Sequence, residues 1–252
     1  MNKPYVNLTK DQEVAYIEFF HPKHNSLPSN LLRDIEQAIK KAGDNSAIKV
    51  IVLQSGGART FCSGASFEEM IDIDNEEEGK SFFSGFANVI NTMRTCPKLI
   101  IGRIQGKAVG GGVGLIACTD YCLATKHAAI KLSELSIGIG PFVISPAIER
   151  KIGFTAMSQI ILKSDTFFSA EWAKQKGLFT EVYENNEELD IEVKAIAELV
   201  CTYTPESVRE IKNIFWKGTE NWDTLLAERA KISGRLVVSD ITKKKLKSLQ
   251  IK

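Results

Sequence analysis

Hydrophobic positions near the start of the chain predict a β-hairpin followed by a helix. Residues 5–8 and 14–20 are rich in apolar and aromatic side chains, and the polar turn TKDQE joins them, as between two antiparallel strands. The segment 30–42 follows Pro28 and carries apolar residues at helical spacing on one face, namely Leu31, Leu32, Ile35 and Ile39. We therefore predict that the fold opens with a hairpin and an amphipathic helix.

Two later runs have the composition of strands buried on both faces of a sheet. Residues 48–53 (IKVIVL) and 99–104 (LIIGRI) are almost entirely apolar and rich in β-branched side chains. A second helix is predicted over 80–93, and the short apolar runs at 121–124 and 129–132 predict two further strands. This alternation of strand and helix predicts an α/β fold through about residue 185.

The pattern becomes mainly helical after Pro146. We predict a core over residues 1–185 and a helical C-terminal region over residues 186–252, with no repeat or linker between them. Helices are expected at 147–151, 155–162, 170–176, 189–202, 207–216, 221–233 and 240–250.

Charge and hydropathy exclude several classes of protein. The 252 residues hold 32 Lys and Arg against 31 Asp and Glu, a formal net charge of +1, which gives no field to attract nucleic acid. The longest apolar runs, such as 109–118, are too short to span a bilayer, and the N-terminus MNKPYVNLTKDQE lacks the apolar core of a signal peptide. We expect a cytoplasmic protein with neither a nucleic-acid nor a membrane partner.

Cysteines and histidines give no sign of a disulfide framework or a metal centre. The five cysteines are odd in number and include no CxxC pair, as in reduced and mostly buried thiols: Cys62, Cys96, Cys118, Cys122 and Cys201. Of the three histidines, His21 and His24 are close in sequence but have no third ligand near them. We expect no bound metal.

Two glycine-rich segments follow buried strands and are candidates for holding a negative charge. Gly110, Gly111 and Gly112 precede an apolar segment, and a helix that begins there would present free backbone N–H groups. The alternative, which the sequence supports equally, is that the glycines serve only close packing. Neither GxGxxG nor a P-loop is present. The second segment, 60–66 (TFCSGAS), has no GxSxG elbow around Ser63. N–H groups from both loops would form an oxyanion hole if they met at one carbonyl oxygen.

Glu134 is the third candidate. It lies among apolar residues at a strand-to-loop junction, in AIKLSELSIGIGP. A carboxyl group in apolar surroundings has a raised pKa and exchanges protons near neutral pH. The alternative for a single glutamate is a solvated side chain or a partner in a helix cap.

Five segments, in order along most of the chain, resemble the crotonase superfamily, the enoyl-CoA hydratase/isomerase family. They are HPKHNSLP, SGGARTFCSGASFEEM, QGKAVGGGVGLIACTDYCLAT, KLSELSIGIGP and FSAEWAKQKGLFTEVY. The resemblance implies a spiral of ββα units with a C-terminal helical region that drives trimer formation, and trimers of the family commonly pair into hexamers. We therefore expect a homotrimer or homohexamer.

The resemblance also implies roles for particular residues. Backbone N–H groups of Ala65 and Gly111 would hold the thioester oxygen of an acyl-CoA, while Glu134 would transfer protons at the carbon beside it. Lys23 and Ser63 would contact the CoA portion, together with Ala65. Coenzyme A enters as part of the substrate, so no separate cofactor is expected. The lysines of the C-terminal tail are candidates for phosphate contacts or for a solvated helix face: Lys243, Lys244, Lys245 and Lys247.

Two departures from the family pattern bear on the reaction. Most hydratases of the family carry a first glutamate directly after GGGx and a second about twenty positions later; here the first position is Gly114 and the second is Glu134. The usual GAGGTQRL stretch is also replaced by bulkier residues, and Phe142, Val143 and Ile144 are expected to reshape the acyl pocket.

A single glutamate leaves several reactions open. Double-bond isomerisation of an enoyl-CoA needs one acid–base group and no activated water, whereas hydration needs water activated by another group. Hydration of a branched enoyl-CoA such as methylglutaconyl-CoA, decarboxylation and thioester hydrolysis are alternatives on the same scaffold. A non-catalytic acyl-CoA-binding paralogue is the alternative outside enzyme function.

Overall fold

The computed structural model describes residues 3–250 and contains one large sheet of six strands. The strands lie in the order β1-β2-β4-β7-β9-β12. Only the β1/β2 hairpin is antiparallel, and every other pair in this sheet is parallel. Their bounds are β1 (Tyr5–Asp11), β2 (Val14–Phe20), β4 (Val50–Ser55), β7 (Leu99–Ile104), β9 (Tyr121–Thr125) and β12 (Glu181–Tyr183). The predicted hairpin and buried strands are confirmed.

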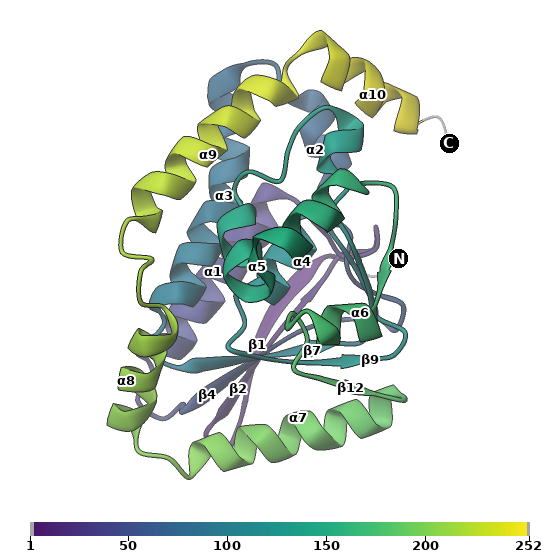
Figure 1. Ribbon diagram of the computed structural model, residues 1–252. Helices are drawn as coiled ribbons and strands as arrows, with labels where there is room; N and C mark the ends of the chain where they lie inside the picture. The colour runs from purple at the N-terminus through teal and green to yellow at the C-terminus, as the bar shows by residue number, and fades with distance from the viewer. Residues whose placement is uncertain (1–2, 251–252) are drawn as a thin grey trace.

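Helices cover both faces of the large sheet (Figure 1). On one face lies α7 (Asn186–Cys201), while α1 (Ser29–Asp44), α3 (Glu76–Thr95) and α4 (Gly111–Ala117) lie on the other. The β4 strand explains why its sequence is apolar throughout. Its Val50 and Val52 pack with α7, whereas the alternate residues Ile51 and Leu53 belong to the main core on the opposite face.

A second, smaller sheet carries the loops that form the site. Its strands lie in the order β11-β10-β8-β5, with parallel pairs except for β10/β11. The strands β3 and β6 form a separate two-stranded parallel sheet. The bounds are β3 (Ser26–Leu27), β5 (Thr60–Cys62), β6 (Gly64–Ala65), β8 (Lys107–Val109), β10 (Ala129–Lys131) and β11 (Phe168–Ser169).

The remaining helices confirm the helical pattern predicted after Pro146. They are α5 (Ser145–Leu162), α6 (Ala170–Gln175), α8 (Pro205–Phe215), α9 (Trp222–Val237) and α10 (Asp240–Gln250). Gly153, at φ +74°, breaks α5 into two parts, as the predicted pair of shorter helices requires. The short α2 (Phe67–Asp72) was not predicted; it begins at Ser66, whose hydroxyl accepts the Glu69 N–H.

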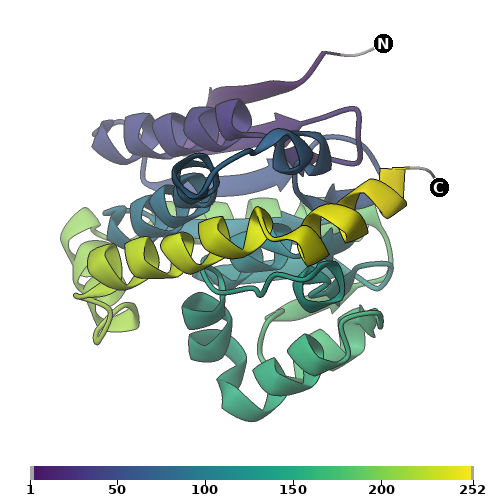
Figure 2. The same ribbon diagram turned by 90° about the horizontal axis from the view of Figure 1, so that it is seen from above.

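The C-terminal helices fold back over the core instead of forming a separate layer (Figures 1 and 2). Helix α9 runs alongside α3, and two glycines face each other where the helices cross. A Cβ on Gly79 would lie 2.7 Å from the Cα of Gly234, so only glycine permits this approach. None of the helices in residues 3–250 is both long enough and apolar enough to cross a membrane.

A buried ion pair ties α8 to the sheet. Lys212 Nζ lies 2.6 Å from Asp120 Oδ2, and each side chain is only 3% exposed. The same carboxylate accepts the Ile100 N–H at 2.7 Å and the Trp216 Nε1–H at 3.0 Å. Because several donors share the desolvated charge, removing one partner leaves a buried carboxylate without its counter-ion.

We predict that Lys212→Met lowers the free energy of unfolding by about 3–5 kcal/mol, since it strands the Asp120 charge in the interior. Denaturant unfolding of the variant measures this loss. The matched control is Lys217→Met, on the exposed surface just after the same helix, with an expected change within about 0.5 kcal/mol. A Lys212→Met loss no larger than the control's would contradict the prediction.

Candidate active site

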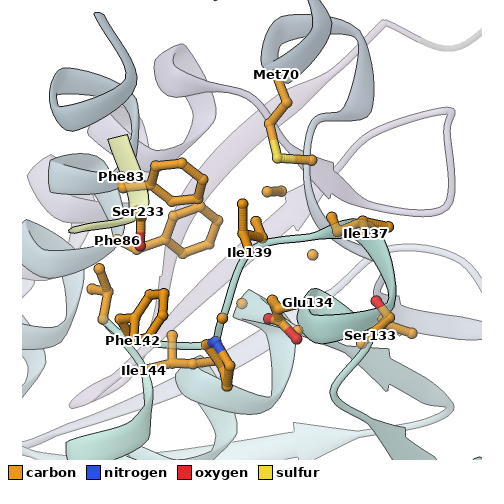
Figure 3. A pocket seen from close by; sticks show the side chains of 18 of the residues that line it. Met70, Phe83, Phe86, Ser133, Glu134, Ile137, Ile139, Phe142, Ile144 and Ser233 are labelled. Carbon is orange, nitrogen blue, oxygen red and sulfur yellow. The ribbon is translucent and has the colours of Figure 1, made fainter. Parts of the chain in front are cut away.

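An apolar pocket lies where α2, α3, α4 and the loop after β10 meet (Figure 3). Aromatic and aliphatic side chains form most of its wall: Met70, Phe83, Phe86, Ile139, Phe142 and Ile144. Among the described residues that line it, Glu134 is the only acidic or basic side chain. The pocket therefore offers one titratable group in a hydrophobic setting.

Gly110 and Gly111 place the start of α4 at the edge of this pocket. Gly110 has φ +51° and ψ −120°, a conformation that an L side chain rarely adopts, and its N–H donates to Lys131 O at 2.9 Å. Gly111 is the first residue of α4. The first N–H groups of a helix have no acceptor within it, so the Gly111 N–H is available to an oxygen from outside the helix.

Ala65 reaches the same pocket from β6. The Ser66 N–H donates to Leu27 O at 3.2 Å, and successive N–H groups of an extended segment point to opposite sides, so the Ala65 N–H points away from β3. The preceding Gly64 has φ +90°, and a Cβ there would lie 2.8 Å from Val109 O and 3.5 Å from Gly111 N. The two glycine-rich loops are thus in contact, and both predicted N–H donors border one cavity.

Glu134 begins a 3₁₀ turn, η1 (Glu134–Ile137), directly after β10. Figure 3 shows its carboxylate directed into the pocket. The residue as a whole is partly accessible, but its Oε2 is shielded from solvent and has no hydrogen-bond partner within residues 3–250. A Cβ on Gly110 would lie 2.6 Å from Oε1, so the glycine is what lets the carboxylate sit against α4.

Burial raises the pKa of Glu134 to about 7, against an ordinary 4.5. Desolvation is the main cause, and a hydrogen bond from the residue's own backbone opposes it in part. A carboxyl group with this pKa both accepts and returns a proton near neutral pH. The structure thus shows the solvent-shielded carboxyl group that the apolar sequence around Glu134 predicts.

Lys23 and Ser63, the predicted CoA contacts, lie side by side near the pocket. The Ser63 hydroxyl donates to Lys23 O at 3.3 Å, and Ser63 lines the pocket. Lys23 pairs with Glu68 on α2 in an exposed ion pair. Its ammonium is therefore at the surface, where a phosphate can compete for it.

The sequence left two roles open for Lys243, a phosphate contact and a place on a solvated helix face. The structure shows a third, a contact with α2. Its Nζ donates to the carbonyl oxygens at the end of α2: Ile71 O at 2.6 Å, Met70 O at 3.4 Å and Ile73 O. It thus caps the helix that carries Met70 over the pocket. The other three lysines of the tail are exposed: Lys244, Lys245 and Lys247.

The sequence missed the contribution of α3 to the pocket. Phe83 and Phe86 extend from α3 opposite Glu134, and the ring of Phe86 fills the space where a Cβ on Gly111 would be, with Cζ 2.8 Å from that point. The spacing of these aromatic residues by three along a helix was available as a signal. It does not by itself distinguish a pocket wall from core.

The buried carboxylate has a measurable cost. A pKa raised from 4.5 to about 7 means that the folded state binds protons more tightly, so stability falls as pH rises between these values. We predict that Glu134→Gln, which removes the charge, has the same free energy of unfolding as wild type below about pH 4.5. Above about pH 7 the variant gains about 3 kcal/mol relative to wild type. Urea unfolding of both proteins across this range measures the difference, and a difference independent of pH would contradict it.

Comparison with known proteins agrees with this geometry. Residues 9–250 match the enoyl-CoA hydratase/isomerase family. A short-chain-enoyl-CoA hydratase of Clostridium acetobutylicum is 27% identical over 232 residues, which cover 91% of this chain and 88% of that protein. A peroxisomal Delta(3,5)-Delta(2,4)-dienoyl-CoA isomerase of Arabidopsis thaliana is also 27% identical, over 83% of this chain and 80% of its own.

The fold has the same relatives. The crystal structure of an enoyl-CoA hydratase from Bacillus halodurans superposes with a TM-score of 0.89, covering 97% of this chain and 99% of the other at 23% identity. The match shows that the α/β core and the C-terminal helices have the crotonase fold expected from the sequence. With the family matched over nearly the whole chain, the protein belongs to the enoyl-CoA hydratase/isomerase family and is an acyl-CoA-processing enzyme.

Proposed function

We propose that the enzyme moves the double bond of an enoyl-CoA, from the 3,4 to the 2,3 position, with Glu134 as its one acid–base residue. The observation that carries this proposal is the pocket lining: of its described residues only Glu134 is titratable, and its pKa is about 7. Allylic isomerisation needs one group that removes a proton and returns it. Water addition needs a second group to activate water.

In the proposed reaction the Glu134 carboxylate takes a proton from C2 of the substrate. The electrons of that C–H bond form a dienolate, whose oxygen accepts hydrogen bonds from the N–H groups of Ala65 and Gly111. The protonated Glu134 then delivers the proton to C4, and the electrons shift to leave a C2–C3 double bond and the restored thioester carbonyl. One carboxyl group completes the cycle and returns to its starting form.

The wall of the pocket supports an apolar acyl group. A carboxylate on the acyl chain would need a cation or several donors once it was buried. Neither Lys nor Arg is present among the described residues that line the pocket. Aromatic residues such as Phe83 and Phe142 instead favour an unbranched or branched hydrocarbon chain.

The CoA portion, assembly and location complete the proposal. We place CoA along the loop 21–26 and the loop 60–66, with Lys23 and Ser63 as contacts and no separate cofactor. A homotrimer or homohexamer is supported by apolar side chains that remain exposed on the C-terminal helices, including Ile211, Ile214, Phe215 and Ile241. The proposed location is the cytoplasm.

Hydration of an enoyl-CoA is the second candidate function. The observation in its favour is that the Clostridium acetobutylicum relative is a short-chain-enoyl-CoA hydratase. Under this alternative, water would have to be activated without a second carboxylate from the pocket wall.

We predict that Glu134→Gln lowers the turnover of 3-hexenoyl-CoA by at least about 100-fold, because the amide cannot accept the C2 proton. Wild-type turnover should rise with pH through about 7, as the carboxylate forms. The control is Glu149→Gln, an exposed glutamate on α5, with turnover expected within about twofold of wild type. Turnover of Glu134→Gln close to that of the control would overturn the role of Glu134.

Mass spectrometry in D₂O separates the two candidate functions. 3-Hexenoyl-CoA and crotonyl-CoA are incubated in turn with the enzyme. A shifted double bond leaves the mass unchanged except for exchanged deuterium, whereas water addition adds one D₂O. Water addition to crotonyl-CoA with 3-hexenoyl-CoA left unchanged would favour hydration over isomerisation.

A further inference from the structure

Ile144 occupies the place of a side chain at position 114. A Cβ on Gly114 would lie 2.7 Å from Ile144 Cβ and nearer still to its Cγ2, and the three atoms nearest to that point all belong to Ile144. Ile144 is only 4% exposed and lines the pocket. The absence of a side chain at Gly114 is therefore matched by an isoleucine from another segment, just before α5.

The filled space faces the reaction site. Gly114 lies one helical turn beyond Gly110, so the two positions share one side of α4. Glu134 packs against that side at Gly110, and Ile144 packs against it at Gly114. Figure 3 shows Ile144 and Glu134 on the same wall of the pocket. The substrate thus meets a carboxylate at one turn of α4 and a methyl-bearing side chain at the next.

An isoleucine at this point excludes both a second acid–base group and an ordered water. A buried water needs two to four polar partners, and the side chain of Ile144 supplies none. Its neighbours Phe142 and Val143 are apolar as well. The carbon of the acyl group that lies over this turn is therefore shielded from nucleophilic attack by water.

We propose that Ile144 is the specificity-determining residue of the pocket: by filling the space over Gly114 it restricts the enzyme to proton transfer and prevents water addition. This inference deepens the proposed isomerisation and rests on it for the role of Glu134. The substrate class it selects is an enoyl-CoA whose acyl chain is apolar near C3.

The packing of Ile144 over Gly114 also indicates which two substitutions would allow the enzyme to add water. With Gly114→Glu and Ile144→Gly combined, the new carboxylate has room to take a proton from water while the water oxygen bonds to C3 of a 2-enoyl-CoA. The C2–C3 π electrons shift to form the enolate, and protonated Glu134 delivers a proton to C2. Both carboxyl groups then exchange protons with solvent, so the net change is the addition of one water.

The first measurement tests the packing without any substrate. Gly114→Ala should lower the melting temperature by about 5 °C, because its methyl group overlaps Ile144. In the double variant Gly114→Ala/Ile144→Ala the two losses should be clearly less than additive. Val143→Ala, which removes a neighbouring apolar side chain, is the control and should add independently to Gly114→Ala. Additive losses for the 114/144 pair would overturn the proposed packing.

The second measurement is the ratio of water addition to double-bond migration in H₂¹⁸O, followed by mass spectrometry with crotonyl-CoA and 3-hexenoyl-CoA. Gly114→Glu/Ile144→Gly should raise this ratio at least tenfold over wild type, and more than Gly114→Glu alone. Glu149→Gln, an exposed change on α5 outside the pocket wall, is the control and should leave the ratio as in wild type. A ratio in the double variant no higher than in the control would overturn the role of Ile144.

The failures of the two proposals are distinguishable. If wild type itself mainly adds water while Glu134→Gln is inactive, the isomerisation fails, and with it the exclusion of water by Ile144. If wild type shifts the double bond but the double variant gains no water addition, isomerisation stands and Ile144 is not the determinant.

Discussion

The site depends on one electrostatic constraint, the burial of a single carboxyl group whose charge no Lys or Arg among the described residues of the pocket wall offsets. Glu134 keeps a pKa of about 7 because the surrounding apolar side chains desolvate it, and the glycine at position 110 lets it approach the start of α4. That approach brings the proposed proton-transfer group beside the N–H groups that would stabilise an enolate. The arrangement lowers stability at neutral pH, because the charged carboxylate of Glu134 would be better solvated by water than by the apolar pocket.

The fold supplies this constraint by bringing together segments from distant parts of the chain. Parallel strands of the small sheet place the loops after β5, β8 and β10 at one end, so Ala65, Gly111 and Glu134 come together although about seventy residues separate the first from the last. Helix α2 closes the pocket from above, and Lys243 of α10 holds the end of that helix through its carbonyl groups. The C-terminal helices thus support the pocket from within the same chain.

Much of this architecture was predictable from local pattern. The β-branched runs at 48–53 and 99–104 predict strands covered on both faces, and Val50 and Ile51 indeed pack on opposite faces. The two glycine-rich loops and Glu134 were candidates from their local sequence. Their meeting in one site was predicted only through the resemblance of short motifs, because spacing alone does not bring Ala65 near Gly111. Helix α2 escaped prediction since six residues hold too little periodicity. The bond of Lys243 to α2 is a tertiary contact between residues about 170 apart, for which no local pattern exists.

The pairing of Gly114 with Ile144 shows how a side chain from one segment fills the space that a side chain on another segment would occupy. A glycine alone at this position would leave a cavity beside the substrate, open to water and costly for packing. The isoleucine restores a filled interior and makes the same wall apolar. In sequence the two changes appear as unrelated departures thirty residues apart, one apparently disabling and the other merely bulky. In the structure they are one packing arrangement, in which the side chain of Ile144 fills the space over Gly114. Under the proposed function, hydrocarbon stands there where a second carboxylate would lie, and Glu134 acts alone.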